Sequence, residues 1–372
     1  SARLEELRGL RLKTPLTLRP GTRKEYAQYV LANARRVYGG DLAPAGEALK
    51  TLGLIPAKLR LDLALTAQAG FGTKVFAQGT ELCLLDAAAG DEWILNKMDL
   101  ALVDQHFAPV AAGTYDAQMA LAALRMGDAE VVKHLIWGAG RLPGDAARKS
   151  AADAAAWERG ESRLASAVAP RLFVRTGDFA WRRGAAFALE IFTRGGGLRA
   201  LDDAWARPPA GTEQVLHPDK YFADERPVLL DLAPLEAFLK AQARSPAWTS
   251  TLGELGLALV LETHFPGEDL TKVSEGWAGD SLILFTADGA APLLAWATEW
   301  DTEEDAVEFQ AQAFRLLRKL TLPESDVAAT AVRRGTSVFF AAGVPRGRED
   351  ALLDAAWTCR RTRQGRRDTY GD

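Results

Sequence analysis

The spacing of apolar residues changes along the chain, and this change constrains the fold more than any other sequence feature. Over most of the first two thirds, apolar side chains recur every three or four positions, as in Arg23–Tyr38, which is typical of amphipathic helices. In the C-terminal third they form short continuous runs instead. Ser281–Phe285 and Leu293–Ala297 flank the turn dipeptide Asp288-Gly289, which predicts a β-hairpin. The sequence therefore predicts an α+β fold that is mostly helical, with small antiparallel hairpins.

The same patterns locate the other elements. Helices are expected over Leu59–Gln68, Asp91–Phe107, Tyr115–Trp137, Asp145–Val168, Phe179–Trp205 (two helices separated by Gly195-Gly196-Gly197), Trp248–Thr263, Thr302–Leu320 and Glu349–Cys359. Further hairpins are expected from Lys74–Phe76 with Glu81–Leu85 and from Val327–Val332 with Ser337–Phe340. Thr212 has the pattern of an N-cap residue. We expect one large domain over residues 1–320, a hairpin and helix over 321–359 packed on that same domain, and a basic disordered tail over 360–372.

Composition excludes several classes of protein. Of the 372 residues, 48% are hydrophobic, which is enough for a sizeable core. With 45 Lys and Arg against 49 Asp and Glu, the net charge of -4 provides no overall basic field, which argues against nucleic acid as a partner. There is no run of 18 apolar residues, so we expect no transmembrane segment. Two cysteines, Cys83 and Cys359, are too few for a disulfide scaffold or a four-thiolate metal site.

The common catalytic motifs are absent from the sequence. There is no G-x-S-x-G nucleophile elbow, no P-loop and no dinucleotide-binding fingerprint. No two of the four histidines have the i, i+4 spacing that places two imidazoles on one helical face. These histidines are His106, His134, His217 and His264. Residue spacing alone therefore identifies no active site.

A resemblance gives more information. The expected helix Asp91–Phe107 ends in Asp104-Gln105-His106-Phe107, which resembles the end of the H-E-L-T-H-A-L-x-D-Q-H-F helix of a bacterial family of zinc metallopeptidase-like proteins. Other blocks of that family occur in the same order, namely Gly70-Phe71, Gly127-Asp128-Ala129, Arg194-Gly195-Gly196, Ala204–Pro209, Thr212–Tyr221, Gly276–Asp280 and Trp300-Asp301-Thr302. The resemblance runs from about Arg23 to the last expected helix. It implies a zincin-like core within residues 1–320.

The resemblance also implies that the catalytic positions have been lost. The first zinc histidine of the family falls on Asn96, the general-base glutamate on Lys97, the second zinc histidine on Leu100 and the third ligand on Met126. Zinc is bound by imidazole, carboxylate or thiolate groups, and an ammonium group cannot accept a proton from zinc-bound water. The resemblance therefore implies a pseudopeptidase with no zinc and no other cofactor. We expect Lys97 to replace the metal's charge and to pair with a carboxylate such as Asp128.

We expect the former substrate groove to bind a protein or peptide partner, or the chain to act as a scaffold. The candidate groove residues are His106, Glu213, His217, Tyr221, Trp277 and Asp280. Two alternatives stay open: an active hydrolase with a displaced site around His106, Glu213 and His217, and a structural component of the cell envelope or of an assembly. The resemblance implies an exported or envelope location with a signal or lipoprotein segment removed, while the sequence itself leaves a cytoplasmic location open.

Overall fold

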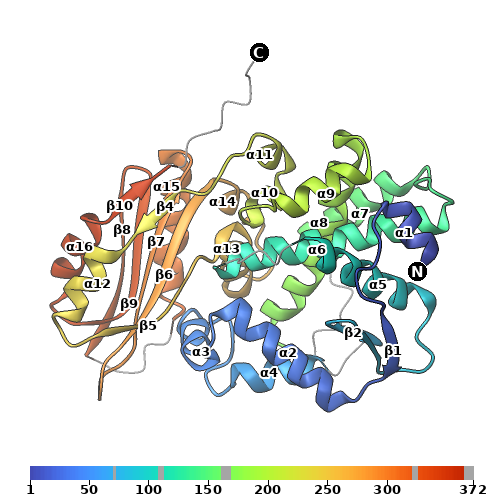
Figure 1. Cartoon of the computed structure of the whole chain (residues 1–372). Helices are drawn as coiled ribbons and strands as arrows, with labels where there is room; N and C mark the ends of the chain where they lie inside the picture. Colours follow the sequence, from blue (N-terminus) through green and yellow to red (C-terminus); the bar gives the residue numbers. More distant parts are fainter. Residues whose placement is uncertain (70–72, 108–112, 161–168, 321–325, 364–372) are drawn as a thin grey trace.

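A helical region and a five-stranded sheet lie side by side in the molecule (Figure 1). The computed structural model describes residues 1–69, 73–107, 113–160, 169–320 and 326–363. The expected α+β class is confirmed, because helices predominate and the main sheet is antiparallel. Within the described residues, no helix combines the length and apolar character that a membrane span requires.

The elements have the following bounds. The helices are α1 (Ala2–Arg8), α2 (Arg23–Tyr38), α3 (Leu42–Thr51), α4 (Leu61–Ala69), α5 (Asp91–His106), α6 (Tyr115–Trp137), α7 (Ala146–Glu158), α8 (Arg171–Gly195), α9 (Leu198–Ala206), α10 (Thr212–Leu216), α11 (Pro218–Phe222), α12 (Ala233–Lys240), α13 (Gly253–His264), α14 (Thr271–Glu275), α15 (Glu303–Leu317) and α16 (Glu349–Trp357). The strands are β1 (Thr17–Pro20), β2 (Val75–Gln78), β3 (Glu81–Leu84), β4 (Leu229–Asp231), β5 (Ser245–Ser250), β6 (Trp277–Thr286), β7 (Leu293–Trp300), β8 (Val327–Arg334), β9 (Ser337–Pro345) and β10 (Arg360–Thr362).

The two longest helices, α6 and α8, form the centre of the helical region. Their backbones touch where each helix carries a glycine. A Cβ atom on Gly127 would lie 1.9 Å from the carbonyl oxygen of Gly184, and one on Gly184 would lie 2.3 Å from that of Ala123. Since no larger side chain fits at this crossing, the glycines fix how closely α6 approaches α8. The resulting contact holds α6, which lines the cleft described below.

The main sheet has the strand order β5-β6-β7-β9-β8 and is antiparallel throughout. Alternate residues of its central strands face opposite sides, and both sides are buried. Ile283 faces α12 and α16, whereas Leu282 and Leu284 belong to the larger core. On that second side, Phe309 of α15 stacks on Trp300 with ring centroids 4.7 Å apart. Helices therefore cover both faces of the sheet.

The C-terminal hairpin belongs to this sheet. Strands β8 and β9 form the expected hairpin, and β9 pairs along β7. The segment expected over 321–359 thus continues the sheet that residues before 320 begin. The expected tail starts differently from the prediction, because Arg360–Thr362 form strand β10, paired antiparallel with β4. Residues 364–372 of that tail lie outside the described residues, as do residues 161–168 of the expected helix Asp145–Val168.

Two further local expectations are wrong. Trp248, expected at the start of a helix, lies in β5, and the helix begins only at Gly253. Thr212 does not cap α10: the N-cap is Gly211, and the Thr212 hydroxyl donates instead to Asp116 Oδ1. Elsewhere near the N-terminus, strand β1 pairs parallel with β3, so that the expected hairpin of β2 and β3 becomes a three-stranded sheet.

Candidate functional site

The four positions that the resemblance assigns to zinc and its base lie on two helices that pack together, α5 and α6. Asn96 and Leu100 are buried, while Lys97 and Met126 are partly buried. Burial of the ammonium group, with a smaller contribution from the charge of Arg125, lowers the pKa of Lys97 to about 8. The position that the resemblance assigns to the general base therefore carries a lysine in a poorly solvated environment.

Arg8 of α1 connects these two helices. Its Nε donates to Asp99 Oδ1 on α5 at 2.9 Å, and its Nη2 donates to Asp128 Oδ2 on α6 at 2.5 Å. The side chains of Arg8, Asp99 and Asp128 are all fully buried. Trp205 Nε1 also donates to Asp128 Oδ2, at 2.7 Å. Arg8 thus forms a buried ionic link between α5 and α6.

This link makes one expectation wrong. Lys97 does not pair with Asp128: Arg8 and Trp205 both bond to Oδ2 of that carboxylate, and its Oδ1 has no hydrogen-bond partner among the described residues. Among the described residues, Lys97 forms no ion pair with any other acid. The ammonium of Lys97 is therefore not neutralised in the way that the charge-replacement hypothesis requires.

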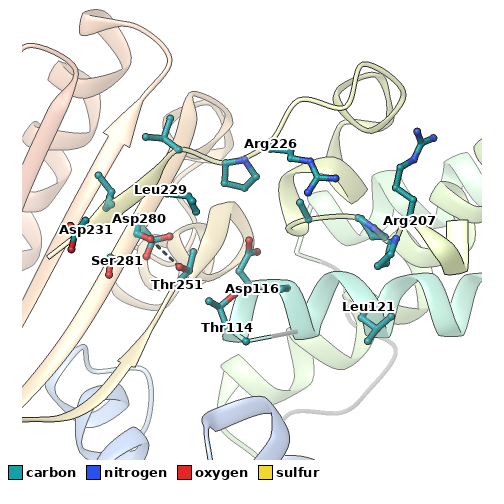
Figure 2. Close-up of a pocket in the computed structure, with 18 of the residues that line it drawn as sticks. Thr114, Asp116, Leu121, Arg207, Arg226, Leu229, Asp231, Thr251, Asp280 and Ser281 are labelled. Carbon is teal, nitrogen blue, oxygen red and sulfur yellow. Dashed lines mark hydrogen bonds between the residues drawn. The ribbon is translucent and has the colours of Figure 1, made fainter. Parts of the chain in front are cut away.

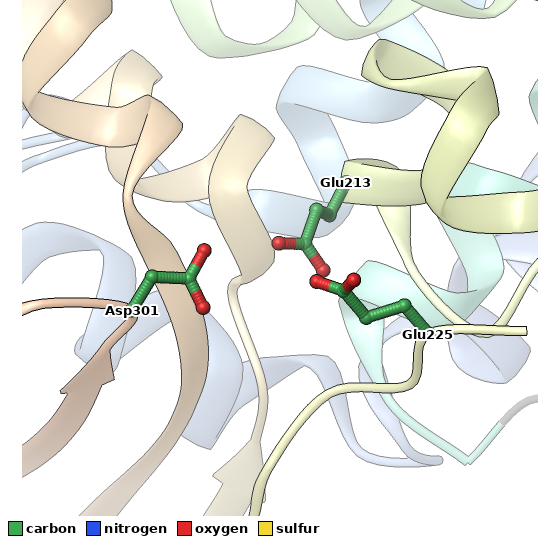
Figure 3. Close-up of side chains that lie close together, drawn as sticks. All are labelled: Glu213, Glu225 and Asp301. Carbon is green, nitrogen blue, oxygen red and sulfur yellow. The ribbon is translucent and has the colours of Figure 1, made fainter. Parts of the chain in front are cut away.

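A second polar cluster surrounds Lys220 on α11. Its ammonium lies 2.5 Å from Glu213 Oε1, 3.3 Å from Glu225 Oε1 and 3.0 Å from Asp301 Oδ2. Figure 3 shows the three carboxylates converging, and one oxygen of each lies within 4.8 Å of the others. Burial raises the pKa of Glu213 to about 8, although the charge of Lys220 opposes this shift. The three acids have a spacing that suits a metal, but a lysine ammonium already lies among them.

Three more of the candidate groove residues, His217, Tyr221 and His106, lie in two separate places. His217 Nε2 lies 2.9 Å from Glu254 Oε1, and this hydrogen bond raises the pKa of His217. Tyr221 is buried, and its hydroxyl donates to the carbonyl oxygen of Arg207. His106 is elsewhere: its Nε2 lies 2.6 Å from the carbonyl oxygen of Arg11. Among the described residues, no hydrogen bond joins it to the cluster around Glu213. The structure therefore does not assemble the displaced site expected from all three residues.

Asp280 of β6 accepts four hydrogen bonds. Its Oδ1 accepts from Gly253 N and Trp277 Nε1, and its Oδ2 accepts from Leu252 N and Trp296 Nε1, at 2.8 to 3.1 Å. Burial nevertheless raises its pKa to about 6. Trp277 is completely buried and so belongs to the core instead of presenting a groove surface. Asp280 connects the sheet to the start of α13.

Asp116, near the start of α6, makes a comparable link to α10. Its Oδ1 accepts from both the backbone nitrogen and the hydroxyl of Thr212, at 2.9 and 2.5 Å. The Thr212 hydroxyl in turn accepts from Leu255 N on α13. Among the described residues, none donates a hydrogen bond to Asp116 Oδ2. Burial raises the pKa of Asp116 to about 7. No sequence motif identified Asp116, because its partner Thr212 is 96 positions away.

Asp116 is expected to make stability depend on pH. Its pKa is about 7 in the folded protein against 3.8 for a free side chain, so the folded state binds the proton more tightly. Stability should therefore fall as the pH rises from about 4 to 7, by about 4 kcal/mol from this group, since one pKa unit is worth about 1.4 kcal/mol. In Asp116→Asn, which mimics the neutral acid, this contribution should disappear. Urea denaturation of both proteins at pH 4, 6 and 8 measures it, and identical pH profiles would contradict the assignment.

A cleft lies beside Asp116 and Asp280, between α6 and the sheet (Figure 2). Its volume is about 930 Å³. It is lined mainly by the start of α6, the loop after α9, the segment leading into β4 and β4 itself. These elements contribute Thr114, Asp116, Ala117, Leu121, Arg207, Pro208, Pro209, Arg226, Pro227, Val228, Leu229, Leu230 and Asp231. Thr251, Asp280 and Ser281 complete its wall on the side of the sheet. Of the six expected groove residues, only Asp280 lines this cleft.

Comparison with known proteins identifies one domain. Residues 243–354 match a domain of unknown function, DUF8575. The match begins just before β5 and ends within α16, so it spans the five-stranded sheet and crosses the boundary expected at residue 320. No curated protein and no solved structure matches the chain.

Proposed function

We propose that this protein is a non-catalytic, metallopeptidase-like protein whose cleft between α6 and the sheet binds a segment of a protein or peptide. The residues at the four former catalytic positions support the loss of peptidase activity. Leu100 offers no lone pair to a metal, and Asn96 and Met126 are poor zinc ligands. Lys97 cannot replace a carboxylate base, since an ammonium cannot take a proton from water.

The cleft is the observation that carries the binding role. Its volume of about 930 Å³ lies near the upper end of the range usual for ligand sites. Its walls combine apolar residues, among them Pro208, Pro209 and Val228, with polar and charged ones. Leu229 on its wall is 52% exposed, although it is a large apolar side chain. A wall that offers both apolar surface and polar groups suits an extended peptide, which has apolar side chains and a polar backbone.

Metal analysis tests the loss of zinc. After incubation with zinc and dialysis, the wild-type protein is expected to retain none at its α5–α6 contact. The variant Asn96→His/Lys97→Glu/Leu100→His/Met126→Glu restores the donors of the resemblance and serves as a positive control, with about one zinc per chain. About one tightly held zinc in the wild type, with peptide hydrolysis that a chelator abolishes, would overturn the proposal.

Peptide selection tests the binding role. Random-sequence peptides displayed on phage should be enriched by the immobilised protein, and the selected peptides should lose affinity for Leu229→Asp because a charge would face the apolar wall. Val307→Asp is the matched control, since Val307 is 49% exposed on α15 and does not line the cleft. Failure to enrich any peptide, or equal affinity of both variants and the wild type, would reject the cleft as the site.

A further inference from the structure

The cleft has charges of opposite sign at its two ends. Figure 2 places Arg207 and Arg226 on one side and Asp231 on the other. Arg207 is exposed, and among the described residues its guanidinium forms no ion pair; it lies 5.9 Å from the ring centre of Tyr221. Arg226 is partly buried, and its Nε donates to Asp224 Oδ1 at 3.1 Å. One end therefore presents two guanidinium groups, one of them without a carboxylate partner among the described residues.

The opposite end presents a carboxylate. Asp231 is exposed, and its Oδ1 accepts a hydrogen bond from Ala233 N at 3.0 Å. No ion pair involves Asp231 within the described part of the chain. The residue opposite Asp231 in the β4–β10 pairing is Arg360. A carboxylate that accepts only a backbone hydrogen bond keeps its negative charge available to a ligand.

The acids at the bottom of the cleft do not cancel this polarity. Asp280 directs both oxygens at four donors of the protein itself, so its acceptor positions are already occupied. Asp116 is bonded to Thr212 and is almost completely buried. The charges that a ligand would meet are therefore those at the two ends, with an apolar wall that includes Pro208 and Leu229 between them.

We propose that the cleft selects a peptide segment with an acidic side chain at one end, bound by Arg207 and Arg226, and a basic side chain at the other, bound by Asp231. This inference rests on the proposed function of the cleft. A guanidinium matches the planar geometry of a carboxylate and can donate two parallel hydrogen bonds to it. Complementary charges at the edge of an interface also exclude partners of the wrong sign, because like charges brought together are unfavourable.

Four synthetic peptides test the charge pattern. All have blocked ends, a fluorescent label and the same apolar middle, and they carry Glu and Lys at opposite ends, Glu at both, Lys at both, or Ser at both. Fluorescence anisotropy measures their affinities for the full chain. The wild type should bind the Glu and Lys peptide about tenfold more tightly than the Ser peptide, which is about 1.4 kcal/mol. This preference should shrink at high salt, because the end charges are accessible to solvent.

Variants should change the preference in opposite directions. Arg207→Glu/Arg226→Glu makes both ends acidic and should favour the peptide with two lysines. Asp231→Lys makes both ends basic and should favour the peptide with two glutamates. Arg35→Glu/Arg199→Glu is the control, since both arginines are exposed and lie outside the cleft. It should keep the wild-type order.

The outcomes separate the two proposals. The same order of affinities in every variant, with binding that still depends on Leu229, would overturn the charge pattern and leave peptide binding intact. No detectable binding of any of the four peptides, together with no enrichment of displayed peptides, would overturn the proposed function and this inference with it. If the order of peptide affinities changes in only one of the two variants, the residues altered in the other variant do not select the ligand.

Discussion

Arg8→Met should destabilise the protein by about 3–5 kcal/mol, which is the usual cost of leaving a buried charge without its partner. The side chains of Arg8, Asp99 and Asp128 have no exposure to solvent, so water cannot replace the guanidinium. Methionine fills much of the volume of the arginine stem, so the loss comes mainly from the two fully buried carboxylates, Asp99 and Asp128. The third partner of Arg8, Asp202, is 22% exposed and contributes less. Urea denaturation followed by circular dichroism measures the change.

Two further variants test whether unpaired buried charges cause the loss of stability in Arg8→Met. Arg3→Met alters an exposed arginine on the same helix and should change stability by less than about 0.5 kcal/mol. Adding Asp99→Asn and Asp128→Asn to Arg8→Met removes the two fully buried unpaired charges and should recover part of the lost stability. If Arg8→Met behaves like Arg3→Met, the ionic link does not hold α5 against α6.

Asp280→Asn should cost about 3 kcal/mol or more, although it changes only one atom of the side chain. Each carboxylate oxygen accepts two hydrogen bonds. An amide has one oxygen, so in either orientation its NH₂ group would face two N–H donors. Each buried donor left without an acceptor costs about 1–3 kcal/mol. Thermal denaturation with tryptophan fluorescence measures the effect, because Trp277 and Trp296 are among the donors.

The matched control for this variant is Asp116→Asn. Both aspartates are buried and line the same cleft, but hydrogen bonds reach only Oδ1 of Asp116 from the described donors. An asparagine can keep those bonds with its single oxygen, so Asp116→Asn should be tolerated at neutral pH. If both substitutions destabilise the protein equally, the number of N–H donors on each carboxylate does not determine the cost of the amide.

The sequence predicted best those elements whose signals are local. The hairpin of β6 and β7 followed from its Asp288-Gly289 turn, and helices α5 and α6 followed from their apolar spacing. Trp248 was misplaced because β5 and α13 follow each other closely, so one apolar pattern runs through both. Strand β10 escaped prediction because its pairing with β4 uses the backbone and needs no apolar period.

The contacts that assemble the candidate site are long-range, and this is why the sequence did not reveal them. Arg8 reaches across 91 positions to Asp99, and nothing in its local sequence distinguishes it from an exposed arginine. Thr212 looked like a helix cap because residues of that type usually cap, but a buried acid 96 positions away competes for its hydroxyl. The groove candidates came from blocks of a family motif, and Trp277 in one of these blocks supports the core.

The pairing of β10 with β4 has a consequence for detecting ligands. One edge of β4 bonds to Arg360–Thr362, while the same strand contributes Leu229 and Asp231 to the cleft wall. The three residues of β10 are all exposed, and a pair of such short strands opens readily on its own. A bound peptide that steadies β4 should slow deuterium uptake at the β10 amides. Mass spectrometry of this short segment would then report that the cleft is occupied, without any label on the ligand.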